Sequence, residues 1–499
     1  MFYVSTRGNQ PAVSSAEAIK MGISPDGGLF VPDAPVTVGP DVMRKMKDMT
    51  YRDRAAEILR LYLTDFTAAE LEECTGGAYN TTNYDVEEIA PVKELESGTY
   101  VLELWHGPTC AFKDMALQIL PRFLPRAAAK TGEKGEIVIL VATSGDTGKA
   151  ALEGFKDVPG TRIFVFFPDQ GVSQVQRLQM ITQEGGNVGV ASVRGNFDDA
   201  QSGVKAIFTD PEMNRMVGEK GFRFSSANSI NWGRLAPQIV YYFSAYLDLL
   251  KEGKLSGGEP VNFVVPTGNF GNILAGFYAS EAGLPVNRLI CAANENNVLT
   301  DFIRTGVYDR NRRFVKTISP SMDILISSNL ERLLYELTGR DTASVRGWMQ
   351  DLKENGVYRV GREIYSRLQS LFWSDFSDDR ETMAAIRDTY ESTGYVADTH
   401  TAVGLDVYKK YVEQTGDRTK TVIVSTASPF KFNASVVKAL LGEEAVAGKN
   451  EFELLKVLAQ VSLMEIPAGL RGLERRPVLH QRVVAGEEMP RAVLDFLGI

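Results

Sequence analysis

Short apolar runs alternate with longer helix-like runs through most of the chain beyond the polar segment Asn80–Asn83. Helix-like runs include Leu235–Leu250 and Ile273–Ala282. Strand–helix alternation is typical of parallel sheets, because parallel neighbours need a crossover connection. Several strand-like runs are apolar throughout, as strands covered on both faces are. We therefore predict an α/β fold of open, mostly parallel sheets with helices on both faces. The strand-like runs are Tyr100–Leu104, Ile137–Ala142, Arg162–Phe167, Val188–Val193, Val261–Val265, Leu289–Ala292 and Thr421–Val424.

The length of 499 residues suggests about three domains, at roughly 100–200 residues each. Residues 1–90 form a predicted small N-terminal domain, in which the turn Asp26–Gly28 leads into a short strand. Residues 91–440 contain the strand–helix alternation and form the predicted core. Residues 441–499 carry no informative motif, and we expect them to form a C-terminal extension that packs on the core.

The composition excludes several classes of function. A net charge of −9 and a pI near 5.2 argue against nucleic acid or an anionic membrane as the main partner. The three cysteines and three histidines lack the spacing of a disulfide framework or a metal site. No apolar run approaches the ~20 residues of a membrane-spanning helix. With no apolar leader at the N-terminus, we expect a cytoplasmic protein that acts on a small molecule.

Lys113 is the candidate reactive residue. It follows Ala111 and Phe112 and opens a mostly apolar, helix-like run, Met115–Ala129. Apolar surroundings disfavour an ammonium ion and lower the pKa of the amine. Such an amine attacks carbonyl groups. The alternative is a lysine at a helix start whose stem covers apolar surface.

The loops that follow the strands are the next candidates, since ligands bind parallel sheets at the carboxyl ends of strands. Thr143–Gly148 includes Ser144, Asp146 and Thr147 and follows the strand Ile137–Ala142. Glycines and small hydroxyl residues at a helix N-terminus can cradle an anion. Ordinary helix capping is the alternative.

A second loop, Gly268–Asn272, lies between a strand and a helix. Its two glycines let the backbone approach a ligand, and its asparagine amides can donate hydrogen bonds. No Gly-Lys-Ser/Thr sequence follows, so the loop is not of the Walker type. A cofactor phosphate is the better interpretation, and a plain tight turn is the alternative.

Two further stretches supply polar groups. Asn228–Arg234 precedes a helix, and its arginine and asparagine amides can form a second phosphate site; a surface arginine is the alternative. Ser425–Phe432 places Thr426 at a strand end, where a capping residue is the alternative.

A reactive lysine, phosphate cradles and a strand-end hydroxyl on an open α/β sheet suggest pyridoxal phosphate. The chain resembles the threonine synthase family, in the tryptophan-synthase-β-like (fold type II) class of pyridoxal-phosphate enzymes. The N-terminal STRG and SPDGGLFVP segments match the bacterial and fungal branch of the family. The motifs that carry the resemblance are HGPTxAFKD at 106–114, SGDTG at 144–148, GNFGN at 268–272 and STAxPxKF at 425–432.

The resemblance implies that residues 91–440 form a two-lobed pyridoxal-phosphate catalytic core, and it implies a role for each motif residue. Lys113 would hold the cofactor and shuttle protons, and Thr426 would bond its pyridine nitrogen. Asp146 lies where this class usually has an asparagine near O3′ of the cofactor. The cofactor phosphate would be cradled by Gly268, Asn269, Phe270, Gly271 and Asn272. The substrate phosphate would be held by Ser144, Thr147, Asn228 and Arg234.

The implied reaction is the last step of threonine biosynthesis. O-phospho-L-homoserine and water give L-threonine and phosphate, by γ-elimination followed by addition of water at Cβ. We expect a monomer or a homodimer. Serine or threonine dehydratase and cysteine synthase share the scaffold, but neither needs a second phosphate site, which makes Asn228 and Arg234 the discriminating residues. A ligand-binding protein without activity is a further alternative, and the presence of Lys113 argues against it.

Overall fold

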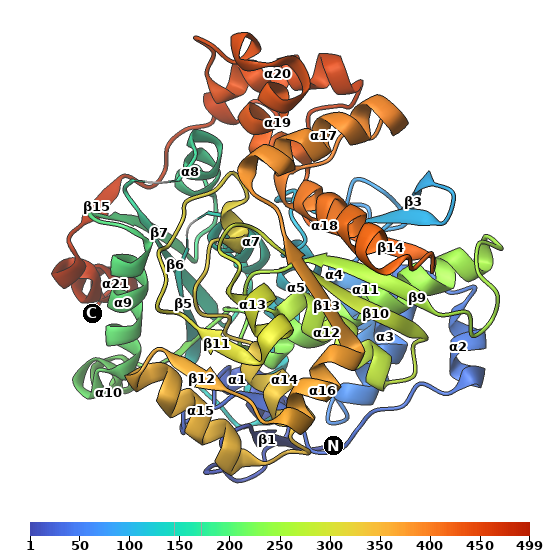
Figure 1. Cartoon of the computed structure of the whole chain (residues 1–499). Helices are drawn as coiled ribbons and strands as arrows, with labels where there is room; N and C mark the ends of the chain where they lie inside the picture. The colour runs from blue at the N-terminus through green and yellow to red at the C-terminus, as the bar shows by residue number, and fades with distance from the viewer. Residues whose placement is uncertain (144, 171) are drawn as a thin grey trace.

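The chain folds around two open sheets, and helices lie against both of them (Figure 1). The computed structural model describes residues 1–143, 145–170 and 172–499. The larger sheet has six strands in the order β13-β10-β9-β14-β4-β3. All neighbouring strands in it are parallel except the edge pair β3 and β4. The strands are β3 (Val92–Glu96), β4 (Thr99–Glu103), β9 (Val261–Pro266), β10 (Val286–Ala293), β13 (Phe372–Phe376) and β14 (Thr421–Ser425).

The second sheet has the order β15-β7-β6-β5-β8 and is parallel throughout. Every residue of β7 and of β9 is buried, as strands covered on both faces require. The predicted α/β fold of mostly parallel sheets is therefore confirmed. The strands of this sheet are β5 (Glu136–Ala142), β6 (Thr161–Pro168), β7 (Val188–Val193), β8 (Phe222–Ser225) and β15 (Arg482–Val484).

Strand β14 lies in the middle of the larger sheet, between β9 and β4. Its residue Val422 pairs with Tyr100 on one side and with Phe263 on the other. Just beyond its carboxyl end, the N–H of Phe112 donates to the carbonyl of Thr426 at 2.8 Å. The lysine segment is thereby joined to the end of this strand.

Helix starts differ from the sequence predictions. Helices α11 (Trp232–Lys251) and α12 (Gly271–Glu281) begin three and two residues earlier than expected, and α7 spans Asp146–Phe155. Thr147, Arg234 and Asn272 therefore lie in first helical turns, where free N–H groups and the helix dipole are concentrated.

The single helix predicted over Met115–Ala129 is wrong. The structure has two helices, α5 (Asp114–Leu117) and α6 (Leu120–Lys130), with Pro121 in the first turn of α6. Proline lacks an N–H and fits a helix start, so it ends one helix and begins the next.

The N-terminal STRG segment docks on α14 (Leu330–Leu337). The Thr6 hydroxyl and the Arg7 guanidinium both donate to the carboxylate of Glu331, at 2.6 Å and at 2.9 and 3.0 Å. The next residue, Arg332, donates through Nε to the carbonyl of Phe30 at 2.9 Å. Phe30 lies in β2 (Phe30–Pro32), which pairs antiparallel with β1 (Tyr3–Ser5).

The C-terminal residues contact both lobes, which are the parts of the molecule built around the six-stranded and the five-stranded sheet. Helix α19 (Asn433–Leu441) packs on α20 (Glu451–Ser462), whereas β15 extends the five-stranded sheet and α21 (Met489–Leu497) lies beside α9 (Figure 1).

In the described ranges no helix is both long and apolar enough to cross a membrane. A short antiparallel pair joins β11 (Val307–Asp309) to β12 (Val357–Arg359). The remaining helices are α1 (Ser15–Met21), α2 (Pro40–Met46), α3 (Tyr51–Tyr62), α4 (Ala68–Ala78), α8 (Gln174–Ile181), α9 (Phe197–Thr209), α10 (Pro211–Glu219), α13 (Val298–Thr305), α15 (Thr342–Glu354), α16 (Arg362–Leu371), α17 (Asp379–Thr393) and α18 (Thr399–Thr415).

Arg7→Ala should lower the free energy of unfolding by about 1 to 3 kcal/mol, because it leaves the buried Glu331 carboxylate with fewer donors. Urea denaturation followed by circular dichroism measures the change. Arg44→Ala is the matched control, since its pair with Asp41 is exposed and surface pairs contribute little. Equal shifts in the two denaturation midpoints would contradict a stabilising role for the Arg7 contact.

Candidate active site

Lys113 immediately precedes α5, and its side chain is only 12% exposed. Its Nζ lies 3.3 Å from the Ser321 hydroxyl and 3.5 Å from Oδ2 of Asp146. Burial lowers the pKa of Lys113, and the nearby cations Lys431 and Arg234 lower it further, whereas Asp146 opposes the shift. The neutral, nucleophilic amine is therefore easier to reach than in a surface lysine.

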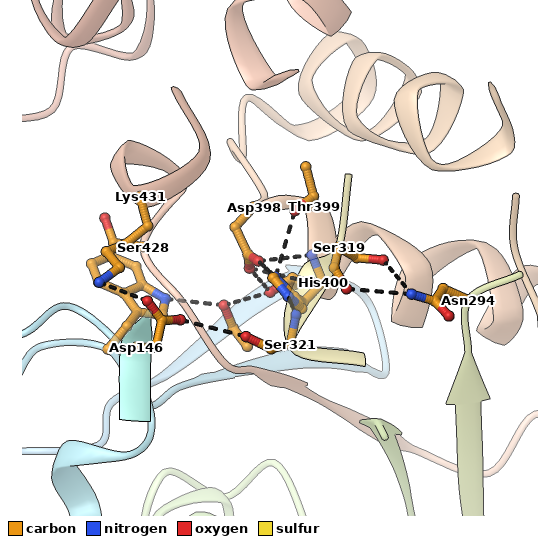
Figure 2. A network of polar contacts seen from close by, with 12 residues as sticks. Asp146, Asn294, Ser319, Ser321, Asp398, Thr399, His400, Ser428 and Lys431 are labelled. Carbon is orange, nitrogen blue, oxygen red and sulfur yellow. Dashed lines mark hydrogen bonds and ion pairs between the residues drawn. The ribbon is translucent and has the colours of Figure 1, made fainter. Parts of the chain in front are cut away.

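Asp146 lies between Lys113 and Lys431, and Figure 2 shows its contact with Lys431. Its Oδ1 lies 2.9 Å from Nζ of Lys431 and accepts a hydrogen bond from the Gln176 amide at 2.9 Å. Burial alone would raise the pKa of Asp146, but Lys431 and Lys113 outweigh it and hold the pKa well below its usual range. The carboxylate therefore stays ionised beside the Lys113 amine.

The loop Gly268–Asn272 connects β9 to the N-terminus of α12. Phe270 adopts the left-handed region, with φ of 63°, which is rare for a bulky residue and costs roughly 1 to 3 kcal/mol. Oδ1 of Asn272 accepts from the hydroxyls of Tyr241 and Tyr242, at 2.6 and 2.8 Å. Its Nδ2 is buried and has no hydrogen-bond partner. This loop thus ends in an unused donor beside a helix N-terminus, where an anion is favoured.

The two glycines of this loop serve different purposes. A Cβ at Gly268 would lie 2.7 Å from the carbonyl oxygen of Ser321, so glycine is needed there for packing within the protein. A Cβ at Gly271 would meet no protein atom closer than 3.5 Å. The missing side chain at Gly271 therefore leaves space that the protein itself does not fill.

Arg332 links this loop to the segment before α11. Its Nη1 donates to Oδ1 of Asn329 at 2.6 Å, and its Nη2 donates to the carbonyl of Ile230 at 2.6 Å. Asn329 in turn donates through its backbone N–H and its Nδ2 to the carbonyl of Asn269, at 3.1 and 3.0 Å. One buried guanidinium therefore positions both predicted phosphate loops.

Arg234 lies in the first turn of α11 and is 3% exposed. Its Nη1 donates to the carbonyl of Ala227 at 2.8 Å, and its Nε is buried without a partner. Within the described parts of the chain no carboxylate forms an ion pair with it, and burial lowers its pKa to about 10. Because a buried, uncompensated cation is costly, this geometry favours an anionic ligand.

The other predicted residues that the structure describes lie past the carboxyl ends of three strands, β14, β5 and β8. Thr426 is buried just past β14, and Thr147 is half-buried in the first turn of α7. Asn228 is half-buried in the loop before α11, where its N–H donates to the Ser226 hydroxyl at 3.2 Å. Ser144 lies outside the described residues.

Four residues of this region were not predicted from the sequence: Lys431, Ser321, Asn329 and Arg332. Lys431 stands inside the STAxPxKF motif, so its position could have indicated a role at the site. The other three lie between Ala293, where β10 ends, and Leu337, where α14 ends, outside every motif.

Comparison with known families divides the chain into three matches. Residues 2–79 match the family model described as threonine synthase N terminus. Residues 75–365 match the model of pyridoxal-phosphate dependent enzymes. Residues 401–492 match the model described as threonine synthase, C-terminal.

Curated relatives and solved structures agree with these matches. Threonine synthase from Pseudomonas aeruginosa is 39% identical, over 89% of this chain and 91% of its own length. Human threonine synthase-like 1 is 40% identical over 85% of this chain, which spans 58% of that relative's length. The crystal structure of pyridoxal-phosphate-bound threonine synthase from Brucella melitensis has a TM-score of 0.88 at 36% identity and covers 99% of both chains. The chain therefore belongs to the threonine synthase family of pyridoxal-phosphate dependent enzymes.

Proposed function

We propose that this protein converts O-phospho-L-homoserine and water to L-threonine and phosphate. One observation carries the proposal: two separate buried donors without partners, Nδ2 of Asn272 and Nε of Arg234, accompany the buried amine of Lys113. One donor suits a cofactor phosphate and the other suits a substrate phosphate. The threonine synthase relatives support the same reaction.

The residues present fit pyridoxal phosphate. Lys113 would bind its aldehyde carbon, and the loop Gly268–Asn272 would hold its phosphate through backbone N–H groups and the free amide of Asn272. Thr426 would bond the pyridine nitrogen, and Asp146 would lie near O3′. When bound, pyridoxal phosphate supplies an electron sink for negative charge on the substrate carbons.

Lys113 would carry the proton transfers. Once the substrate amine has released it, its amine would take a proton from Cα and pass it to the substrate phosphate, and would then move a proton from Cβ to Cγ. As water adds at Cβ, the amine would take a proton from that water and return it at Cα. A lowered pKa suits this work, because the amine must be free to accept a proton near neutral pH.

Arg234 would bind the phosphate that leaves from Cγ, with Asn228, Thr147 and Ser144 as further ligands. A planar guanidinium grips two phosphate oxygens, and the N-terminus of α11 adds positive potential. Charge grows on the leaving phosphate as the Cγ–O bond breaks, so Arg234 would assist both binding and elimination. A dehydratase acting on substrates without phosphate has no use for this buried cation, and the alternative therefore gains no support.

Borohydride reduction of the yellow enzyme should fix the pyridoxyl group to the peptide that contains Lys113. The peptide of Lys431, the other lysine at Asp146, should stay unlabelled, because its amine is committed to Asp146 and Gln179. Mass spectrometry distinguishes the two. Lys113→Ala should lower turnover by about 10²- to 10⁴-fold, as loss of a proton-transfer group does. Label on Lys431 alone would refute the assignment.

Gly271→Ala should weaken pyridoxal phosphate binding without destabilising the cofactor-free protein. The added methyl group meets no protein atom closer than 3.5 Å, and alanine favours a helix more than glycine does. Absorbance titration gives the cofactor affinity, and thermal denaturation of the cofactor-free protein gives the stability. Gly347→Ala, in open space on α15, is the control and should change neither the affinity nor the fold. Unchanged affinity in Gly271→Ala would remove this loop from the cofactor site.

Arg234→Lys should lower kcat/KM for O-phospho-L-homoserine by about 10- to 100-fold, since a hydrogen bond to a charged group contributes about 1.5 to 3 kcal/mol. Slow turnover of L-serine, which has no phosphate, should fall far less. Assays of both substrates on one variant separate loss of phosphate recognition from general damage. Equal losses on the two substrates would reopen the dehydratase interpretation.

The oligomeric state and the cellular compartment stay predictions from the sequence, as do the domain boundaries 1–90, 91–440 and 441–499. Sedimentation of the purified protein would decide between monomer and homodimer.

A further inference from the structure

The segment Ser319–Asp323, which contains the short 3-10 helix η1 (Pro320–Met322), lies beside Lys113. Figure 2 shows Ser319 and Ser321 of this segment with Asn294 and His400. Asn294, the residue after β10, fixes both ends of this segment. Its Nδ2 donates to the backbone carbonyl of Ser319 at 3.3 Å and to Oδ1 of Asp323 at 2.8 Å. A segment without regular structure on either side is thus held rigidly next to the reactive amine.

His400 holds the middle of the same segment. Its Nε2 accepts a hydrogen bond from the backbone N–H of Ser321 at 3.1 Å, and its Nδ1 lies 3.0 Å from Oδ1 of Asp398. Because Nε2 accepts, the ring proton sits on Nδ1 and is donated to Asp398. The histidine is buried at the start of α18, so its ring is a fixed acceptor for Ser321.

The hydroxyl of Ser321 stands between Lys113 and Asp146. Its Oγ is 3.3 Å from Nζ of Lys113 and 3.5 Å from Oδ2 of Asp146. An ammonium ion can only donate and an ionised carboxylate can only accept. The hydroxyl proton is therefore directed to Asp146, and an oxygen lone pair is directed to Lys113.

We propose that Ser321 is a further catalytic residue, whose hydroxyl holds the Lys113 amine in place between successive proton transfers, and that His400 is the positioning residue that fixes Ser321. This inference rests on the proposed function, which requires one amine to serve several carbon atoms in turn. A released lysine has a flexible four-carbon stem and needs a fixed partner to stay in reach. Gly268 lets the Ser321 backbone approach, since a Cβ there would lie 2.7 Å from its carbonyl oxygen.

The charged groups that shift the pKa of Lys113 are Asp146 from α7, Lys431 from the 3-10 helix η2 (Pro429–Phe432) and Arg234 from α11. Ser321→Ala leaves all three charges in place. It removes one acceptor from the ammonium form, so the pKa of Lys113 should fall.

The test compares Ser321→Ala with Ser319→Ala. Ser319 is a buried serine of the same segment whose hydroxyl bonds Asn294 and Thr317. In cofactor-free protein, competitive acetylation across a pH series, read by mass spectrometry, gives the titration midpoint of Lys113. We expect the midpoint to move to lower pH in Ser321→Ala and to stay unchanged in Ser319→Ala.

Turnover gives the second readout. Ser321→Ala should lower kcat for O-phospho-L-homoserine by about 10- to 100-fold with little change in KM, because proton transfer rather than substrate binding is affected. Ser319→Ala should stay within a few-fold of the wild type, and Ser321→Thr, which keeps a hydroxyl, should recover most of the loss. An unchanged midpoint in Ser321→Ala, or the same losses in both alanine variants, would overturn the proposal.

His400 has its own pair of variants. His400→Gln keeps an acceptor for the Ser321 N–H, whereas His400→Leu removes it. Only the leucine variant should shift the Lys113 midpoint, and equal behaviour of the two would remove His400 from the proposal. The midpoint is measured without substrate or cofactor. If the wild-type enzyme forms no threonine, the proposed function is refuted, and the midpoint still tests the contact between Ser321 and Lys113.

Discussion

The carboxylate of Asp146 is surrounded by more positive charge than it can neutralise. It meets Lys431 at 2.9 Å and Lys113 at 3.5 Å, and the pKa of Lys113 is lowered further by the buried Arg234. Taking cations out of water costs several kcal/mol each unless an anion or a set of acceptors replaces the water. The excess charge therefore favours an anionic ligand, and Lys431 and Arg234 also lower the pKa of Lys113.

Arg332 is another buried cation, and it joins distant parts of the chain. Its guanidinium touches the carbonyl of Phe30 in the N-terminal unit, the carbonyl of Ile230 before α11 and the side chain of Asn329 beside the Gly268–Asn272 loop. The three acceptors are carbonyl oxygens, so the charge is hydrogen-bonded without being cancelled. Docking of the N-terminal unit and the shape of both predicted phosphate loops therefore depend on one buried side chain.

The sheets and the loop positions could be predicted from the sequence, because apolar strands followed by glycine-rich turns leave a strong local pattern. Val188–Val193 was predicted with the limits it has in the structure. Strand β13 was missed because its sequence FWSDF contains polar residues, and β8 because it is short and partly exposed. No sequence pattern around Ser321 indicates its role, because that role depends on a contact with Lys113, 208 positions away in the chain.

The central position of β14 has a consequence for the synthesis of this protein. Its neighbour β4 ends at Glu103, whereas β14 ends only at Ser425. At about 5 to 20 residues per second, the ribosome needs roughly 15 to 65 s to supply the missing strand. During that time the edge of β4 that will receive β14 is open to other chains, as is the edge of β9 once Pro266 has been made, and exposed apolar edges promote aggregation. Protection by chaperones is thus most valuable late in translation, before the last quarter of the chain has emerged.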